Sequence, residues 1–170
     1  EMARDVAGRF NHQLGETFVL PQAKVQEETM YVVGTNGEKM SKSKDNTINI
    51  FLPEKQLRKQ IMGIATDSTP LEDPKNPDSC TVFKLYQLIA PPELQNSMRQ
   101  QYEAGGYGYG HAKQALFECI LETFSEERAA FEYYINHPDE VEKALQLGAQ
   151  KARLVAKDVL QRVRKKLGFV

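Results

Sequence analysis

The stretch Lys39-Met40-Ser41-Lys42-Ser43 separates two parts of the sequence with different patterns and carries its most specific chemical signal. A match to all five residues would arise by chance in roughly one in ten thousand chains of this length. Two ammonium groups, with serine hydroxyls and backbone N–H groups, are suited to stabilise charge that develops on a departing pyrophosphate. A solvated basic loop would share the charges but would not require this order of residues. We therefore predict a phosphate-binding loop at residues 39–43.

The residues around this stretch agree with such a loop. Gly34 and Gly37 precede it and would let it move, which allows contacts made mainly in the transition state. Met40 is expected to anchor the loop by apolar packing. The chain has no G-x-x-x-x-G-K-[ST] string, so the alternative of a P-loop is not supported.

Upstream of the loop, the sequence predicts a small mixed α/β portion that extends to about residue 51. Apolar residues at helical spacing predict a helix over residues 2–14, which Gly15 would end. β-branched and aromatic residues predict short strands near residues 18–20 and at residues 29–33 and 47–51.

Downstream of residue 51, the patterns predict only helices, so the fold class is mainly α. Prolines and apolar spacing place them from Pro53 to about residue 65, over residues 80–90, from Pro91 to about residue 103, over residues 109–135, and from Pro138 onward. The last helix has an amphipathic stripe made of Val141, Leu145, Gly148, Ala152, Val155, Val159, Val163 and Leu167.

Two predictions concern side chains in these helices. The helix over residues 109–135 is expected to bury Leu116, Ile120, Phe124 and Phe131. Tyr107 and Tyr109 lie between glycines and could stack on nucleic-acid bases, but we favour packing on the core.

The composition excludes several classes of protein. The chain has 170 residues, 41% of them hydrophobic, and a formal net charge of -1, which argues against a disordered segment. No apolar run approaches the roughly 20 residues that span a bilayer, so we expect no membrane partner. Cys80 and Cys119 are expected to be ordinary buried thiols, and the three histidines lack the spacing of a protein-ligated metal site.

The low net charge hides an asymmetry between two segments. Residues 116–145 contain eight acidic and two basic residues, whereas residues 151–170 contain seven basic residues and one acidic residue. A basic terminal helix suggests a polyanionic partner. Cations at a helix C-terminus also complement the helix dipole, and an acidic neighbour would neutralise them. The charge pattern alone leaves both readings open.

The pentapeptide resembles the second signature of the class I aminoacyl-tRNA synthetases, and the residues around it resemble the bacterial tryptophanyl-tRNA synthetases. The resemblance covers essentially the whole chain as the C-terminal half of such an enzyme. It is carried by the opening E-M-A-R-D-V-A-x-R-F-N at residues 1–11, by Asn46 and Ile48 after the signature, by A-T-D-S at residues 65–68, by G-A-x-K-A at residues 148–152, and by the closing G-F-V at residues 168–170.

The resemblance implies a fold and an activity. Residues 1–51 would be the C-terminal remnant of a Rossmann-like catalytic domain, and residues 52–170 an all-helical anticodon-binding domain. The whole enzyme would use ATP to make tryptophanyl-adenylate and would pass the tryptophanyl group to tRNA(Trp).

The resemblance also assigns residues to these tasks. Lys39 and Lys42 would be catalytic, and ATP would be bound by Met30, Lys39, Met40, Ser41, Lys42 and Ser43. Arg153, Lys157 and Arg164 recur at helical spacing and are predicted, from their charge, to face tRNA phosphates. Mg²⁺ would be carried by the nucleotide, without a protein-ligated metal.

The remaining expectations concern the whole enzyme and this piece of it. We expect a cytoplasmic, homodimeric parent enzyme and a monomeric piece that cannot activate tryptophan alone, because the first signature and the tryptophan pocket lie upstream in the family. Two alternatives remain: a piece of a tyrosyl-tRNA synthetase, which usually carries an additional C-terminal RNA-binding module, and a non-catalytic RNA-binding module.

Overall fold

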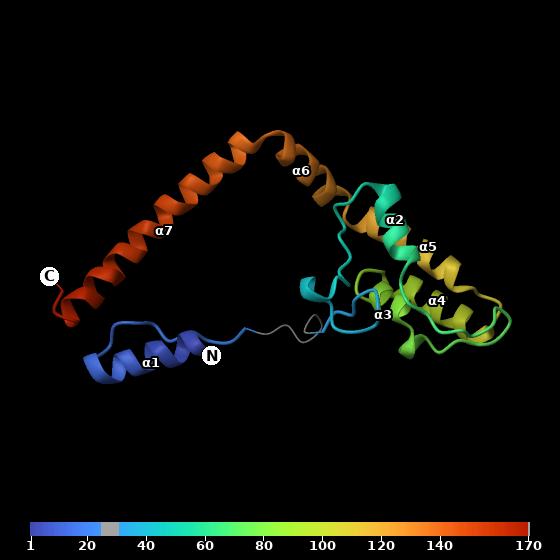
Figure 1. Ribbon diagram of the computed structural model, residues 1–170, viewed down its shortest axis with the longest axis horizontal. Coiled ribbons are helices and arrows are strands. Elements are labelled where there is room, and N and C mark those ends of the chain that lie inside the picture. Colours follow the sequence, from blue (N-terminus) through green and yellow to red (C-terminus); the bar gives the residue numbers. More distant parts are fainter. Residues whose placement is uncertain (25–30, 170) are drawn as a thin grey trace. The chain divides into compact units, whose positions relative to one another are not determined.

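The computed structural model describes residues 1–24 and 31–169, and it divides the chain into two compact units (Figure 1). One unit combines Glu1–Val25 with Tyr134–Val170, and the other comprises Gln26–Tyr133. These bounds are defined by which residues pack together, and they do not test the predicted domain boundary after residue 51, which stays a prediction.

Helices account for the regular structure of the described residues, which confirms the mainly α prediction. The helices are α1 (Met2–Leu14), α2 (Glu54–Met62), α3 (Thr81–Gln87), α4 (Pro92–Ala104), α5 (Tyr109–Thr123), α6 (Ser125–Asn136) and α7 (Pro138–Lys166), with short 3₁₀ turns at Lys42–Lys44 and Pro77–Ser79. The prolines at the starts of α4 and α7 lack only an N–H that the helix would leave unpaired. Gly105 ends α4 with a φ of 77°, a conformation that suits glycine.

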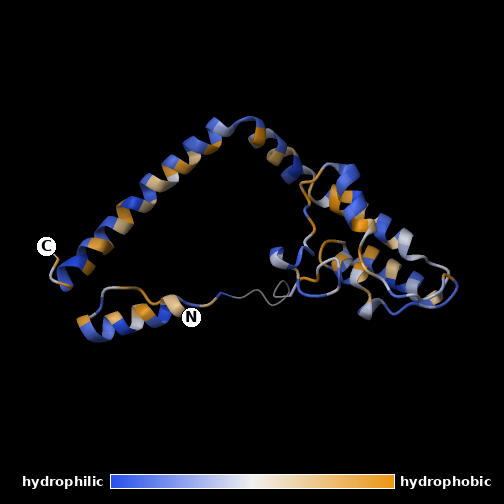
Figure 2. Ribbon diagram, in the orientation of Figure 1, coloured by the Kyte–Doolittle hydropathy of each residue, from blue (hydrophilic) through white to orange (hydrophobic). Residues whose placement is uncertain are grey.

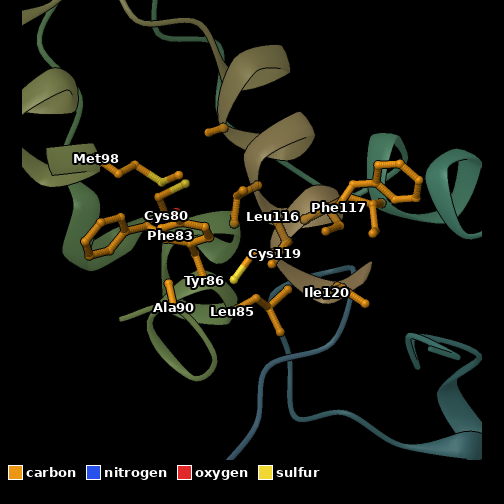
Figure 3. Close-up of a cluster of buried hydrophobic side chains, with 14 of the residues drawn as sticks. Cys80, Phe83, Leu85, Tyr86, Ala90, Met98, Leu116, Phe117, Cys119 and Ile120 are labelled. Atoms are coloured by element: carbon orange, nitrogen blue, oxygen red, sulfur yellow. The ribbon is translucent and has the colours of Figure 1, made fainter. Parts of the chain in front are cut away.

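Helices α2 to α5 of the second unit bury a common apolar core (Figure 3). Leu57 and Ile61 on α2, Phe83 on α3 and Tyr102 on α4 are all fully buried. Cys80 and Cys119 are buried free thiols, as predicted. Tyr107 and Tyr109 pack edge-on against the Tyr102 ring, with centroids 5.7 and 6.0 Å away, which confirms core packing for both tyrosines.

The predicted strands near residues 18–20 and at 47–51 are wrong, because the described residues contain no strand. In both segments a side-chain amide takes the place of a neighbouring strand. Asn11 accepts from Phe18 N at 2.9 Å and donates to Phe18 O at 2.8 Å. Gln60 accepts from Asn49 N at 3.0 Å and donates to Thr47 O at 2.7 Å.

The predicted strand at residues 29–33 falls mostly outside the described residues. Within the described part, Val33 forms an isolated antiparallel bridge with Lys39, which closes the turn before the candidate loop.

The predicted helix over residues 109–135 is divided in two at Phe124, where the backbone has φ −106° and ψ 22°. The Ser125 hydroxyl donates to Glu122 O at 2.9 Å at this break. Leu116 and Ile120 are buried and Phe124 is half-buried, but Phe131 is 43% exposed, so its predicted burial is wrong. The Phe131 ring instead stacks on Phe51, with centroids 4.4 Å apart. The Arg128 guanidinium donates to Ile50 O, which likewise attaches α6 to the segment that precedes α2.

The first unit contains α1, the segment that follows it and α7. The Lys166 ammonium donates to Gly15 O at 2.8 Å and to Glu16 O at 3.1 Å, which satisfies carbonyl groups at the C-terminal end of α1. Apolar residues recur along the whole of α7, as the predicted stripe requires (Figure 2). They are largely exposed, since Leu145 is 63% and Leu154 72% exposed.

No helix among the described residues is both long enough and apolar enough to cross a membrane.

Candidate functional site

The predicted phosphate-binding loop is closed at its base by backbone hydrogen bonds. Gly34 N donates to Glu38 O at 2.7 Å, Met40 N donates to Val32 O at 2.8 Å, and Thr35 N donates to Asn46 O at 2.9 Å. The Met40 side chain packs against the apolar core, as its predicted anchoring role requires. The loop therefore projects from a tightly bonded turn that is attached to the helical core.

Its two candidate cations lie on the outer side of the loop. Lys39 and Lys42 are exposed, and in the described part of the chain neither forms an ion pair. Lys44, in contrast, pairs with Glu38 at 2.8 Å, an interaction that raises the pKa of Lys44 and lowers the pKa of Glu38. Of these three lysines, Lys39 and Lys42 are thus the ones available to an anion.

The serines of the loop differ in what they still offer to a ligand. The Ser41 and Ser43 hydroxyls lie 2.9 Å apart and are hydrogen-bonded to each other. The Ser41 N–H already donates to Asn46 Oδ1 at 2.8 Å. The hydroxyls, rather than the Ser41 N–H, are therefore the serine groups that can turn toward a phosphate.

The structure does not bring all predicted site residues together. Met30, the predicted adenine-contacting residue, lies outside the described residues. Arg153, Lys157 and Arg164 are exposed on α7 and belong to the first unit, whereas residues 39–43 belong to the second. Arg153 and Lys157 are one helical turn apart, so they share one face of α7.

A hollow in the second unit, Gln26–Tyr133, was not predicted from the sequence. It has a volume of about 360 Å³ and is lined by Ala65, Thr66, Asp67, Ser79, Cys80, Thr81 and Tyr109. The Tyr109 hydroxyl donates to Asp67 Oδ1 at 2.6 Å. Burial and this carboxylate raise the pKa of Tyr109 to about 12. Hydrogen bonds from Thr69 and Tyr109 lower the pKa of Asp67. Ala65 N donates to Thr35 O at 2.8 Å, which joins this hollow to the base of the loop.

A buried lysine supports the segment around this hollow. Lys75 is 4% exposed, and its ammonium donates to the carbonyl oxygens of Pro70, Leu71 and Asp73 at 2.9 to 3.1 Å. It also lies 5.5 Å from the centroid of the Tyr109 ring. No sequence pattern distinguishes this lysine from a solvated one.

Among the residues that the structure describes, no group of three or more His, Cys, Asp or Glu side chains is placed to hold a metal.

Comparison with known proteins shows the family of this chain and how much of its relatives the chain covers. Residues 1–125 match the family model of the class I tRNA synthetases for tryptophan and tyrosine. The chain is 45% identical to the tryptophan–tRNA ligase of Campylobacter jejuni strain RM1221 and 48% identical to that of Rhodopirellula baltica. Each match covers 99% of this chain and 53% of the relative. The chain thus spans about half the length of the curated relatives it matches.

Solved structures agree with this relationship. The crystal structure of the Campylobacter jejuni tryptophanyl-tRNA synthetase, complexed with ADP and tryptophan, matches with a TM-score of 0.85 and 45% identity. That match covers 97% of this chain and 52% of the other. The tryptophanyl-tRNA synthetase of Mycoplasma pneumoniae matches with a TM-score of 0.64 at 21% identity, which shows a shared fold alone.

Proposed function

The chain belongs to the class I tRNA synthetases of the tryptophan and tyrosine type, and from this we propose that it forms the C-terminal half of a tryptophan–tRNA ligase. The relatives named above are tryptophan enzymes, which favours tryptophan over tyrosine. The chain's match to about half of their length supports the assignment to one half of the enzyme. The whole enzyme would activate tryptophan with ATP and transfer it to tRNA(Trp).

In the activation step, residues 39–43 stabilise the leaving group. A carboxylate oxygen of tryptophan attacks the α-phosphorus of ATP, and the bond from that phosphorus to the bridging oxygen breaks. The electron pair leaves with pyrophosphate, whose negative charge grows as the bond breaks. The ammonium groups of Lys39 and Lys42 follow that charge, since they are exposed and unpaired within the described residues. This availability is the observation that carries the proposal.

The other functions of the enzyme are shared with segments outside this chain. The exposed apolar residues of α1 and α7, such as Val6 and Leu154, support a role for the first unit as a surface that the other half of the enzyme covers. On this proposal, α1 and the loop complete a Rossmann-like catalytic domain, and the helices after residue 51 bind the anticodon region of the tRNA. Mg²⁺ enters with the nucleotide, and the whole enzyme is a cytoplasmic homodimer.

The experiment that tests the function is amino-acid-dependent exchange of pyrophosphate with ATP by the full-length protein. We expect exchange with tryptophan and not with tyrosine. Exchange with tyrosine would favour the sister enzyme. Binding of tRNA without any exchange would favour the non-catalytic RNA-binding module.

The basic residues of α7 provide a test of the tRNA interface. The double variant Arg153→Glu, Lys157→Glu is expected to weaken tRNA(Trp) binding by about tenfold. It should also make the slope of the logarithm of the binding constant against the logarithm of the salt concentration shallower by about two, because two phosphate contacts are lost. The measurement is a binding titration at several salt concentrations. Lys143→Glu is the matched control, since Lys143 lies on the same helix but pairs with Asp139 at 3.2 Å. Unchanged affinity of the double variant at low salt would remove this face of α7 from the tRNA interface.

A further inference from the structure

We propose that Asn46 is the positioning residue that holds the loop of residues 39–43 in its phosphate-binding conformation. This inference rests on the proposed function, because it assigns a role in the activation step to a residue that does not touch ATP. Asn46 is three residues beyond the pentapeptide, and its side chain lies beneath the loop rather than on the outer side. It is 2% exposed, which is unusual for an asparagine so close to a solvent-facing loop.

The Asn46 side chain contacts the backbone of the loop on both sides of Met40. Its Oδ1 accepts from Ser41 N at 2.8 Å, and its Nδ2 donates to Lys39 O at 3.2 Å. The same Nδ2 donates to Asn36 Oδ1 at 2.7 Å, which connects the loop to the preceding turn. Both Nδ2 protons and the Oδ1 acceptor are therefore used, and the backbone on either side of Met40 is fixed by one side chain.

The surrounding backbone is shaped to admit this side chain. At Gly34, a Cβ would lie 2.4 Å from Cγ and Nδ2 of Asn46 and 2.5 Å from its carbonyl oxygen. Only glycine permits that approach, so the close packing explains the residue at position 34. Asp45 has a φ of 51°, in the left-handed region, and this bend turns the chain back so that Asn46 faces Ser41.

These contacts have a direct consequence for Lys39 and Lys42. Asn46 fixes the backbone that bears Lys39 and the N-terminal end of the short turn Lys42–Lys44, while leaving both ammonium groups free. Stabilisation of a developing charge depends on donors that are already in place, because a loop that must reorganise loses part of that stabilisation. Asn46 thus acts through the lysines and not on the substrate.

The test compares Asn46→Ala with Asn49→Ala in the full-length protein. Asn49→Ala is the matched control, because the Asn49 side chain is exposed and accepts from Phe51 N at 3.0 Å without reaching the loop. Two single-turnover rates are measured: formation of tryptophanyl-adenylate, and transfer of tryptophan from the preformed adenylate to tRNA(Trp). The second step releases no pyrophosphate and so provides an internal control. At saturating reactant concentrations, the folded fraction of the enzyme changes the amplitude of a single turnover and not its rate constant.

For Asn46→Ala, we expect adenylate formation to slow by about ten- to a hundredfold, because buried loop groups lose their partners. The transfer rate should stay within about twofold of the unmodified protein, and Asn49→Ala should change neither rate by more than that. Equal losses in both steps for Asn46→Ala would show a general structural role and overturn the proposal, as would an unchanged rate of adenylate formation. Failure of the unmodified protein to activate tryptophan at all would instead overturn the proposed function, together with the inference that rests on it.

Discussion

Replacing Lys42 by alanine in the full-length protein is expected to slow tryptophanyl-adenylate formation by about a hundred- to a thousandfold, the range typical for loss of a charge-stabilising donor. Binding of ATP should change by no more than about twofold, because the contact strengthens only as charge moves onto the leaving pyrophosphate. The measurement is the single-turnover rate as a function of ATP concentration, which separates binding from chemistry.

Lys44→Ala is the matched control for this variant. It removes the same ammonium group two residues further along, where the charge is already paired with Glu38 at 2.8 Å. We expect a rate close to that of the unmodified protein. If Lys42→Ala weakened ATP binding as much as it slowed the reaction, Lys42 would bind ground state and transition state equally, contrary to the role proposed here.

The largest effect on stability is expected at Tyr102. This side chain is fully buried, its ring lies about 6 Å from those of Phe83, Tyr107 and Tyr109, and its hydroxyl contacts Cys80 Sγ at 3.5 Å. Burial raises the pKa of Tyr102, so the hydroxyl stays protonated. Tyr102→Ala should lower the free energy of unfolding by about 3–5 kcal/mol, because it leaves a cavity where α3, α4 and α5 meet.

Urea unfolding measures this loss, and Tyr102→Phe separates the ring from the hydroxyl. The phenylalanine variant keeps the aromatic contacts and loses one weak hydrogen bond, so it should cost no more than about 1.5 kcal/mol. Similar losses in the two variants would mean that the hydroxyl, rather than the packing of the ring, holds this part of the core together.

The helices could be predicted because their signals are local. The helix over residues 2–14 was predicted with the bounds of α1, and Pro92 and Gly105 mark the ends of α4. The division at Phe124 could not be predicted in this way, since neither proline nor glycine interrupts the pattern between α5 and α6. The apolar stripe of α7 was also evident, but a periodic pattern does not say what covers it.

The strand predictions near residues 18–20 and at residues 47–51 were wrong for a physical reason that a local sequence pattern does not contain. A strand requires a partner for its backbone groups, and the amides of Asn11 and Gln60 supply that partner from a helix. β-branched composition is therefore compatible with an extended segment that joins no sheet. In the same way, the buried positions of Asn46 and Lys75 depend on the folded chain and are invisible in the sequence.

The phosphate-binding role of residues 39–43, in contrast, stays a prediction from the order of five residues. The structure adds which of its groups are available: Lys39 and Lys42 face outward, whereas Lys44 and the Ser41 N–H already have partners. It also adds the support beneath the loop, which the pentapeptide alone does not specify.

The central claim is that this chain supplies the pyrophosphate-stabilising loop of an enzyme that activates tryptophan. Its most direct test is exchange of labelled pyrophosphate with ATP, measured for the full-length protein with each amino acid in turn and for residues 1–170 alone. We predict exchange by the full-length protein with tryptophan only, and none by residues 1–170. Exchange that depends on another amino acid, or the absence of tryptophan-dependent exchange by the full-length protein, would contradict the claim.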